Sequence, residues 1–157
     1  MAPPRIRTEV QVMFFDTDCG GVVSNIAYLR FIEIARTHLA GELGLGLAEM
    51  AEKQTYPVVV HTEIDYRQAA KLGDSLVIEG WLDQVEHVRF WCAFRIMRPG
   101  DNTLIAECRQ MLALIEMPRG KLLRLPKHWK KYAKPESIKY PKGECRTGFG
   151  SGGKCNP

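Results

Sequence analysis

The 157-residue sequence lacks closely spaced cysteines that could bind a metal together, and its four histidines do not lie near the cysteines. The cysteines are widely spaced and form no C-x-x-C pair: Cys19, Cys92, Cys108, Cys145 and Cys155. This spacing disfavours a disulfide framework and a structural zinc site, so we expect reduced thiols and no metal. The sequence also has no internal repeat, which excludes a solenoid.

Long apolar runs are absent as well. No segment approaches the roughly 18 apolar residues that a membrane span requires, and residues 1–7 lack the basic-then-apolar layout of a signal peptide. We therefore expect a cytoplasmic protein without a membrane span. The composition, 45% apolar and 25% charged, is typical of one globular domain that folds without metal or disulfides.

Acidic residues are scarce in the last quarter of the chain. Residues 117–157 hold 11 Lys and Arg against Glu136 and Glu144, a balance of 11 − 2 = +9, whereas residues 1–116 balance at 11 − 16 = −5. A basic segment can bind nucleic acid, anionic lipid or a phosphorylated ligand, or it can be a solvated tail. We favour a domain over residues 1–134 followed by a flexible, basic, Gly-rich tail over 135–157, and no nucleic-acid partner.

A strand, a loop and a helix are predicted in the first third of the chain. Residues 9–14 alternate polar and apolar side chains, which indicates a strand, and two aspartates and a Gly-Gly pair make residues 15–25 a loop. From Ile26 the apolar residues recur every three or four positions, which predicts one long helix. Ser24 or Asn25 can cap its start, and Gly44 and Gly46 supply the permissive positions that end it.

Four strands are predicted after this helix, over residues 56–66, 75–83, 88–98 and 103–116. Short turns rich in Gly, Pro, Asp and Asn separate most of them, so we expect an antiparallel meander. A short basic helix is expected over residues 127–132. The predicted class is α+β, with an antiparallel sheet wrapped around one long central helix.

The loop before the helix carries a motif of about eight fixed positions. It reads Phe15-Asp16-Thr17-Asp18-Cys19-Gly20-Gly21-Val22-Val23, followed by Tyr28 and then Glu33-Ile34-Ala35-Arg36. This pattern resembles the opening motif of hotdog-fold acyl-CoA thioesterases, in particular 4-hydroxybenzoyl-CoA thioesterase and its bacterial short- and medium-chain relatives. Ile64-Asp65-Tyr66 and Gly73-Asp74 extend the resemblance, which covers residues 8–116.

The resemblance implies a hotdog fold, a homodimer or homotetramer, and active sites between subunits. It also implies that Asp18 is the catalytic residue, acting either as a nucleophile or as a general base for water. Asp16 is interpreted as structural. Cys19 has acidic neighbours that disfavour a reactive thiolate, so we do not expect it to be the nucleophile.

The start of the predicted helix supplies what a thioester needs. The first backbone N–H groups of a helix are unpaired and positively polarised, so they can stabilise the oxyanion that forms at the carbonyl. By resemblance the donor lies near Ser24, while Gly21 leaves room for close approach of the ligand. Asn25 stands where many relatives have His or Asn, and its amide can donate a hydrogen bond but cannot transfer a proton.

Three further residues are predicted to bind substrate. Tyr28 can line the pocket or lie in the core. The resemblance implies that the strand of His61 runs along the acyl pocket, although His61 can also be a hydrogen-bonded core histidine. By its position in the family pattern, Arg89 is the first candidate for binding the phosphates of coenzyme A, and the basic segment 119–134 is the second.

The function that we predict is acyl-CoA thioesterase activity without a cofactor. Two alternatives stay open at this point: a thioesterase acting on acyl carrier protein, and a non-catalytic acyl-CoA-binding hotdog protein.

Overall fold

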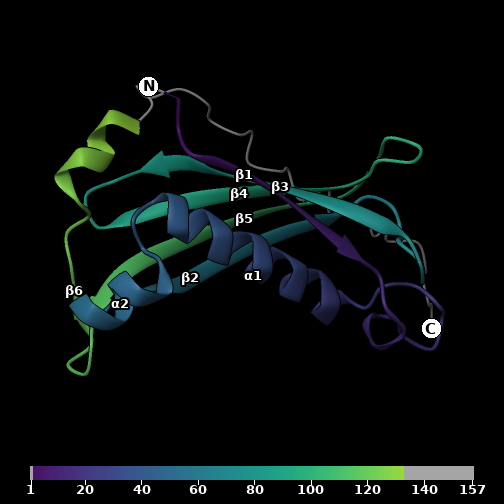
Figure 1. Ribbon diagram of the computed structural model, residues 1–157, viewed down its shortest axis with the longest axis horizontal. Helices are drawn as coiled ribbons and strands as arrows, with labels where there is room; N and C mark the ends of the chain where they lie inside the picture. Colours follow the sequence, from purple (N-terminus) through teal and green to yellow (C-terminus); the bar gives the residue numbers. More distant parts are fainter. Residues whose placement is uncertain (1, 133–157) are drawn as a thin grey trace, which may run out of the picture.

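The structure is a computed structural model, and it describes residues 2–132. An antiparallel sheet curls around one long helix, α1, as Figure 1 shows. The helices and strands are β1 (Arg5–Gln11), the 3-10 helix η1 (Phe14–Asp16), α1 (Asn25–Glu42), α2 (Leu47–Lys53), β2 (Thr55–Tyr66), β3 (Ser75–Val85), β4 (Arg89–Arg98), β5 (Thr103–Glu116), β6 (Lys121–Leu122) and the 3-10 helix η2 (Lys127–Tyr132). The α+β class predicted from the sequence is confirmed.

The order of strands across the sheet is β1-β3-β4-β5-β2, with β6 added to β5. The expected four-strand meander is therefore correct for β3, β4 and β5 but wrong for β2, which pairs with β5 and not with β3. The link between β2 and β3, residues 67–74, crosses about 14 Å of sheet. Eight residues can span roughly 26 Å when extended, so strand order cannot be inferred from the link's brevity.

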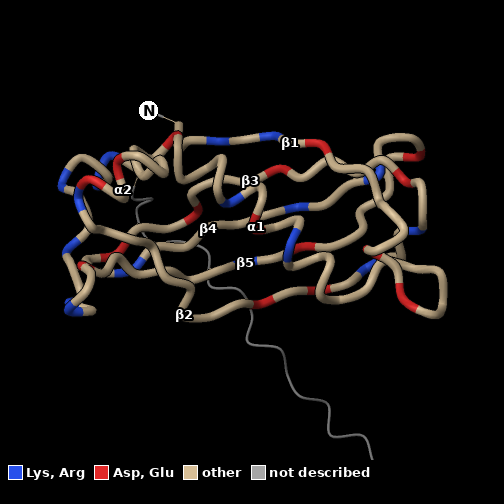
Figure 2. Tube along the Cα trace, turned by 60° about the horizontal axis from the view of Figure 1, so that its bottom comes forward, with Lys and Arg blue, Asp and Glu red and all other residues tan. Residues whose placement is uncertain are grey.

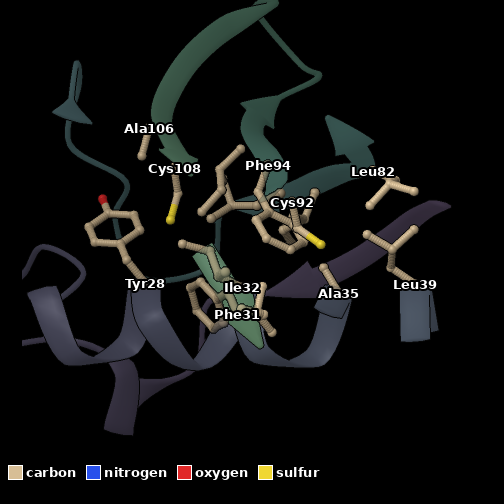
Figure 3. Close-up of a cluster of buried hydrophobic side chains, with 14 of the residues drawn as sticks. Tyr28, Phe31, Ile32, Ala35, Leu39, Leu82, Cys92, Phe94, Ala106 and Cys108 are labelled. Carbon is tan, nitrogen blue, oxygen red and sulfur yellow. The ribbon is translucent and has the colours of Figure 1, made fainter. Parts of the chain in front are cut away.

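The core lies between α1 and the concave face of the sheet. Six helix positions at intervals of one, three and four are buried: Ala27, Tyr28, Phe31, Ile32, Ala35 and Leu39. Figure 3 shows all of these except Ala27, facing sheet side chains that include Phe94 and Cys108. Removing this apolar surface from water stabilises the fold and fixes α1 across the sheet.

The two ends of α1 follow the predicted capping chemistry. The Ser24 hydroxyl accepts a hydrogen bond from the Ala27 N–H at 3.3 Å, so Ser24 is the N-cap. Gly44 has φ +75°, a left-handed conformation that glycine adopts without strain, just beyond the C-cap Leu43. The first residue of the helix and the loop before it are thereby held in place.

The first strand differs from its prediction. It spans Arg5–Gln11 and not residues 9–14, and Phe14 and Phe15 lie in η1 with most of their surface exposed. The apolar run Met13-Phe14-Phe15 extended the strand pattern because an exposed apolar turn cannot be distinguished from a buried strand by hydropathy alone.

The C-terminal part of the described chain closes one end of the core. Trp129, in the predicted short helix η2, is fully buried and contacts Phe90 edge to face, with ring centroids 5.0 Å apart. The helix α2, in the segment expected to be a connector, was not predicted. The tail predicted over residues 135–157 lies outside the described residues.

No helix within residues 2–132 is both long and apolar enough to span a membrane.

Candidate active site

Asp16 anchors the loop that leads into α1. Its carboxylate is 1% exposed, accepts the Met13 N–H at 2.8 Å and forms an ion pair with Arg30. Its backbone carbonyl accepts the Ser24 N–H at 2.9 Å. Asp16 therefore ties the beginning of the loop to its end and to α1, which agrees with the structural role predicted for it.

Asp18 lies in a tight hairpin held by backbone hydrogen bonds. The Asp18 N–H donates to the Val22 carbonyl at 2.9 Å, and Thr17 bridges to Val23. Gly21 has φ +72°, where a side chain would add strain, so a glycine is required to close this turn. The hairpin presents the Asp18 carboxylate at the surface, where one oxygen accepts the Gly20 N–H at 2.8 Å.

The N-terminus of α1 offers backbone donors beside this hairpin. The Ser24 N–H is already bonded to Asp16, and the Ala27 N–H is bonded to the Ser24 hydroxyl. The N–H groups of Asn25 and Ile26 donate to no group within residues 2–132. These two groups carry the positive end of the helix dipole and can receive an oxyanion.

An open pocket of about 370 Å³ begins at this helix end. Such a volume is within the range of small-molecule sites. Its lining combines aromatic, apolar and polar side chains: Val23, Asn25, Tyr28, Tyr66, Arg67, Gln68 and Ala69. The pocket thus joins the start of α1 to the end of β2.

Tyr28 belongs to both the core and the pocket. Its hydroxyl accepts the buried Ala70 N–H at 3.1 Å, and its ring lies 5.3 Å from that of Tyr66 between centroids. Burial raises the pKa of Tyr28, so the phenol stays protonated at neutral pH. Tyr28 therefore lies in the core and also lines the pocket, so the two positions predicted for it are compatible.

The structure gathers some of the predicted site residues and separates others. Asn25 and Tyr28 line the pocket, Ser24 caps the same end of α1, and Gly21 closes the hairpin three residues before Ser24. His61 does not line this pocket: it lies on β2 beside Trp91, with ring centroids 6.1 Å apart, and its Nε2 is 3.2 Å from Glu63.

Arg89 is also remote from the pocket of its own chain. It pairs with Ala113 of β5, whereas Tyr66 at the pocket pairs with Ala106. Seven residues of strand separate these positions, which corresponds to roughly 24 Å.

The pocket also contains Tyr66, Arg67 and Gln68, which the sequence motif does not identify as site residues. They stand directly after Ile64 and Asp65, within the second segment that carried the resemblance. A strand that ends in a Tyr-Arg-Gln run could have drawn attention to the site, because binding residues concentrate where strands give way to loops.

The cysteines and histidines show no second reactive centre in the described part of the chain. Burial raises the pKa of Cys92 and of Cys108 to about 12, so both thiols stay protonated at neutral pH. Cys19 is exposed. Among residues 2–132 no group of three or more His, Cys, Asp or Glu side chains could hold a metal.

Comparison with known proteins matches residues 12–132 to a family described as the thioesterase-like superfamily. The acyl-CoA thioesterase YbgC of Haemophilus influenzae is 36% identical over 123 residues, which cover 77% of this chain and 88% of that protein. A 1,4-dihydroxy-2-naphthoyl-CoA thioesterase from Synechocystis superposes with a TM-score of 0.72 at 26% identity, covering 82% of this chain and 95% of that one.

A probable thioesterase from Bartonella henselae also has a TM-score of 0.72 at 26% identity, with 78% of this chain and all of that chain, 100%, covered. These likenesses confirm the hotdog fold predicted from the motif.

Proposed function

Because the chain belongs to the thioesterase-like superfamily, we propose that it hydrolyses the thioester bond of an acyl-CoA and releases a free acid and coenzyme A. One observation carries this proposal: the Asp18 hairpin leads directly into the start of α1, where the N–H groups of Asn25 and Ile26 donate to no group within residues 2–132 and Asn25 lines an open pocket. Hydrolysis of a thioester needs a nucleophile, or a base that activates water, near the carbonyl carbon and hydrogen-bond donors at its oxygen, and a carboxylate can fill the first role.

The reaction follows from the chemistry of these groups. An oxygen nucleophile, either water deprotonated by Asp18 or the Asp18 carboxylate itself, adds to the carbonyl carbon. The negative charge that develops on the carbonyl oxygen is received by the N–H groups of Asn25 and Ile26. Collapse of this intermediate breaks the carbon–sulfur bond, and the thiolate of coenzyme A leaves. Where Asp18 is the nucleophile, water then hydrolyses the resulting anhydride.

Asp18 suits either role because its carboxylate is exposed and accepts one hydrogen bond, from Gly20. Asp16, two residues earlier, is buried in an ion pair with Arg30 and cannot approach a substrate. The Asn25 side chain also lines the pocket and can donate to the thioester oxygen. Proton transfer is left to Asp18 and water.

We further propose that the active unit is a homodimer formed through β2. This strand is an edge of the sheet over 12 residues, and Val59 and Val60 are 40% and 52% exposed. The other edge, β1, is shorter and alternates Arg5, Arg7 and Glu9 with less polar residues, a pattern that discourages pairing. A two-fold axis pairs β2 with itself in antiparallel fashion.

Such a dimer would complete the site. The pocket lies at the end of β2 and is open in one chain, and Asp18 is exposed. A second copy beside β2 would cover the pocket and exclude water from the thioester, which strengthens electrostatic stabilisation of the oxyanion.

The proposal is tested by measuring coenzyme A release from a panel of aliphatic thioesters, acetyl- to palmitoyl-CoA, together with aromatic acyl-CoAs. Thiol detection needs a blank without substrate because the chain contains five cysteines. We expect turnover of at least one panel member at a rate proportional to enzyme concentration. Absence of turnover on every member, by a protein shown to be folded, would contradict acyl-CoA hydrolysis.

A further inference from the structure

The link between β2 and β3, residues 67–74, makes contacts that the proposed chemistry does not use. We call this link the crossover. The Gly73 N–H donates to the Val12 carbonyl at 3.0 Å, and the Val12 N–H donates to the Asp74 carbonyl at 2.9 Å. The end of the crossover is thereby bonded to the start of the loop that carries Asp18.

The middle of the crossover is bonded to the other end of the same loop. The Val23 N–H donates to the Ala70 carbonyl at 2.8 Å. Lys71 forms an antiparallel bridge with Val22, whose carbonyl accepts the Asp18 N–H at 2.9 Å. The backbone position of Asp18 therefore depends on where the crossover lies.

The crossover also forms part of the pocket. Its first three residues, Arg67, Gln68 and Ala69, line the pocket beside Asn25. One continuous segment is thus bonded to the Asp18 loop and forms a side of the pocket. A shift of this segment would change the distance between the Asp18 carboxylate and a thioester bound in the pocket.

Arg98, the last residue of β4, fixes the crossover to the sheet. Its Nη1 donates to the Asp74 carboxylate at 3.0 Å and to the Ala69 carbonyl at 3.4 Å. The same Asp74 oxygen accepts the Lys71 N–H at 3.0 Å and so closes the turn at the end of the crossover. Arg98 therefore contacts the crossover at two points, one on each side of Lys71.

Asp101 holds the Arg98 side chain in this position. Both of its carboxylate oxygens accept the Arg98 Nε–H at 3.1 Å, and one of them also accepts from Nη2 at 2.8 Å. Paired contacts of this kind fix the orientation of the planar guanidinium. Arg98 itself does not line the pocket, so it can affect a bound substrate only through the crossover.

We propose that Arg98 is a positioning residue: by fixing the crossover, it holds Asp18 at the distance from the thioester that hydrolysis requires. This inference rests on the proposed function. A misplacement of about 1 Å can lower a reaction rate about a hundredfold. Loss of the Arg98 contacts should therefore lower kcat although no group that touches the substrate is removed.

The first test is the turnover of Arg98→Gln, for which we expect kcat to fall about tenfold or more per folded protein. Arg98→Lys keeps the charge but not the planar set of donors, so it should recover only part of the loss. Arg109→Gln is the matched control. Arg109 is paired with Asp83 at 2.8 Å, and its side chain is 24% exposed against 25% for Arg98, but this pair lies outside the crossover.

An unchanged kcat in Arg98→Gln would overturn the inference. An equal fall in Arg109→Gln would also overturn it, because the loss of any half-buried ion pair would then explain the effect. If Arg98→Gln does not fold, Asp101→Asn replaces it. This change removes the charge that orients Arg98, keeps an acceptor for the Thr103 N–H and alters no crossover residue. It should lower kcat about threefold, and an unchanged kcat would overturn the inference.

The second test combines the change with Asp18→Asn to separate positioning from general damage. In the Asp18→Asn background, Arg98→Gln should lower the remaining turnover less than about twofold, because no carboxylate is left to position. A further loss as large as in the wild-type background would overturn the inference, since Arg98 would then act on the fold or the pocket independently of Asp18.

The third test needs no turnover and measures amide hydrogen exchange. In Arg98→Gln the Asp18 and Val23 amides should exchange at least about tenfold faster than in the wild type, because the loop opens more often when the crossover is released. The Leu125 N–H, bonded to the His87 carbonyl at 3.2 Å outside the crossover, should keep its protection.

Unchanged exchange at Asp18 and Val23, or an equal increase at Leu125, would overturn the inference. Faster exchange confined to the loop, in a protein whose wild type hydrolyses no thioester, would support the Arg98 contacts and contradict only the proposed function.

Discussion

At the scale of single residues, two aspartates in one loop differ in their burial. Asp16 is buried, bonded to Met13 and paired with Arg30, whereas Asp18 is exposed two positions later. The family motif predicted this difference, but the residues alone did not, because both carboxylates lie in one loop and either could accept hydrogen bonds within a turn. What decides is the ion pair with Arg30, a contact fourteen residues along the chain.

Tyr28 provides a prediction at this scale. Tyr28→Phe removes the hydroxyl that accepts the Ala70 N–H and leaves this donor buried without its partner. We expect a loss of about 1–3 kcal/mol in the free energy of unfolding, measured by urea denaturation. Tyr66→Phe is the matched control, because Tyr66 is 49% exposed and its ring contact with Tyr28 is retained. Equal stability of the two variants would show that the Ala70 contact is unimportant.

At the scale of helices and strands, periodicity predicted the existence of α1 and of the five main strands but not their order. The boundaries of β2, β4 and β5 agree with the predictions to within a residue, and β3 extends two residues beyond its expected end. The sequence could not predict that residues 67–74 cross the sheet from β2 to β3. The alternation of polar and apolar residues in a strand shows which of its faces is buried but not which strand lies next to it. A pocket position for His61 was implied by the family resemblance, whereas in one chain His61 lies beside Trp91 and Glu63.

Two glycines make a prediction about packing within these elements. Gly80 of β3 has no room for a side chain, because an added Cβ would lie 2.9 Å from the Phe94 ring. Gly41 lies inside α1 with nothing within 4 Å of the same position. Gly80→Ala should therefore lower the free energy of unfolding by about 1–3 kcal/mol, whereas Gly41→Ala should raise it by about 0.5–1 kcal/mol.

Thermal or urea unfolding of both glycine variants gives the comparison directly. Both variants add the same methyl group, so opposite changes in the free energy of unfolding must come from the different surroundings of Gly80 and Gly41. A stabilised Gly80→Ala variant would mean that Phe94 does not pack against β3 as described.

At the scale of the whole molecule, the asymmetry of charge predicted from the sequence becomes a spatial asymmetry. Residues 117–132 hold six basic residues and no acidic one, and Figure 2 shows several Lys and Arg positions at the end of the molecule that carries α2. The sequence shows that this segment is basic but not where it lies in the fold. Its place relative to the pocket depends on β2, the edge strand whose last residue, Tyr66, lines the pocket. The same edge leads to the predicted dimer.

Dimerisation through β2 predicts a specific disruption. Val60→Lys places a charge at the exposed bulge between Val59 and His61, where it would be buried unpaired against a second copy. We expect a monomer in sedimentation-velocity experiments and loss of most thioesterase activity. Gln11→Lys on β1 adds the same charge to the other edge and should leave the dimer intact. A dimeric, fully active Val60→Lys variant would place the interface elsewhere.

The catalytic role of the Asp18 carboxylate is tested by measuring the turnover of Asp18→Asn on the best acyl-CoA substrate. Asparagine keeps the shape of the side chain and its acceptor for Gly20 but removes the carboxylate. We predict that kcat falls at least about a hundredfold while the fold is retained. Glu52→Gln, an exposed residue on α2, is the control for loss of one negative charge and should keep wild-type turnover. Near-normal turnover by Asp18→Asn would show that Asp18 is not the catalytic carboxylate.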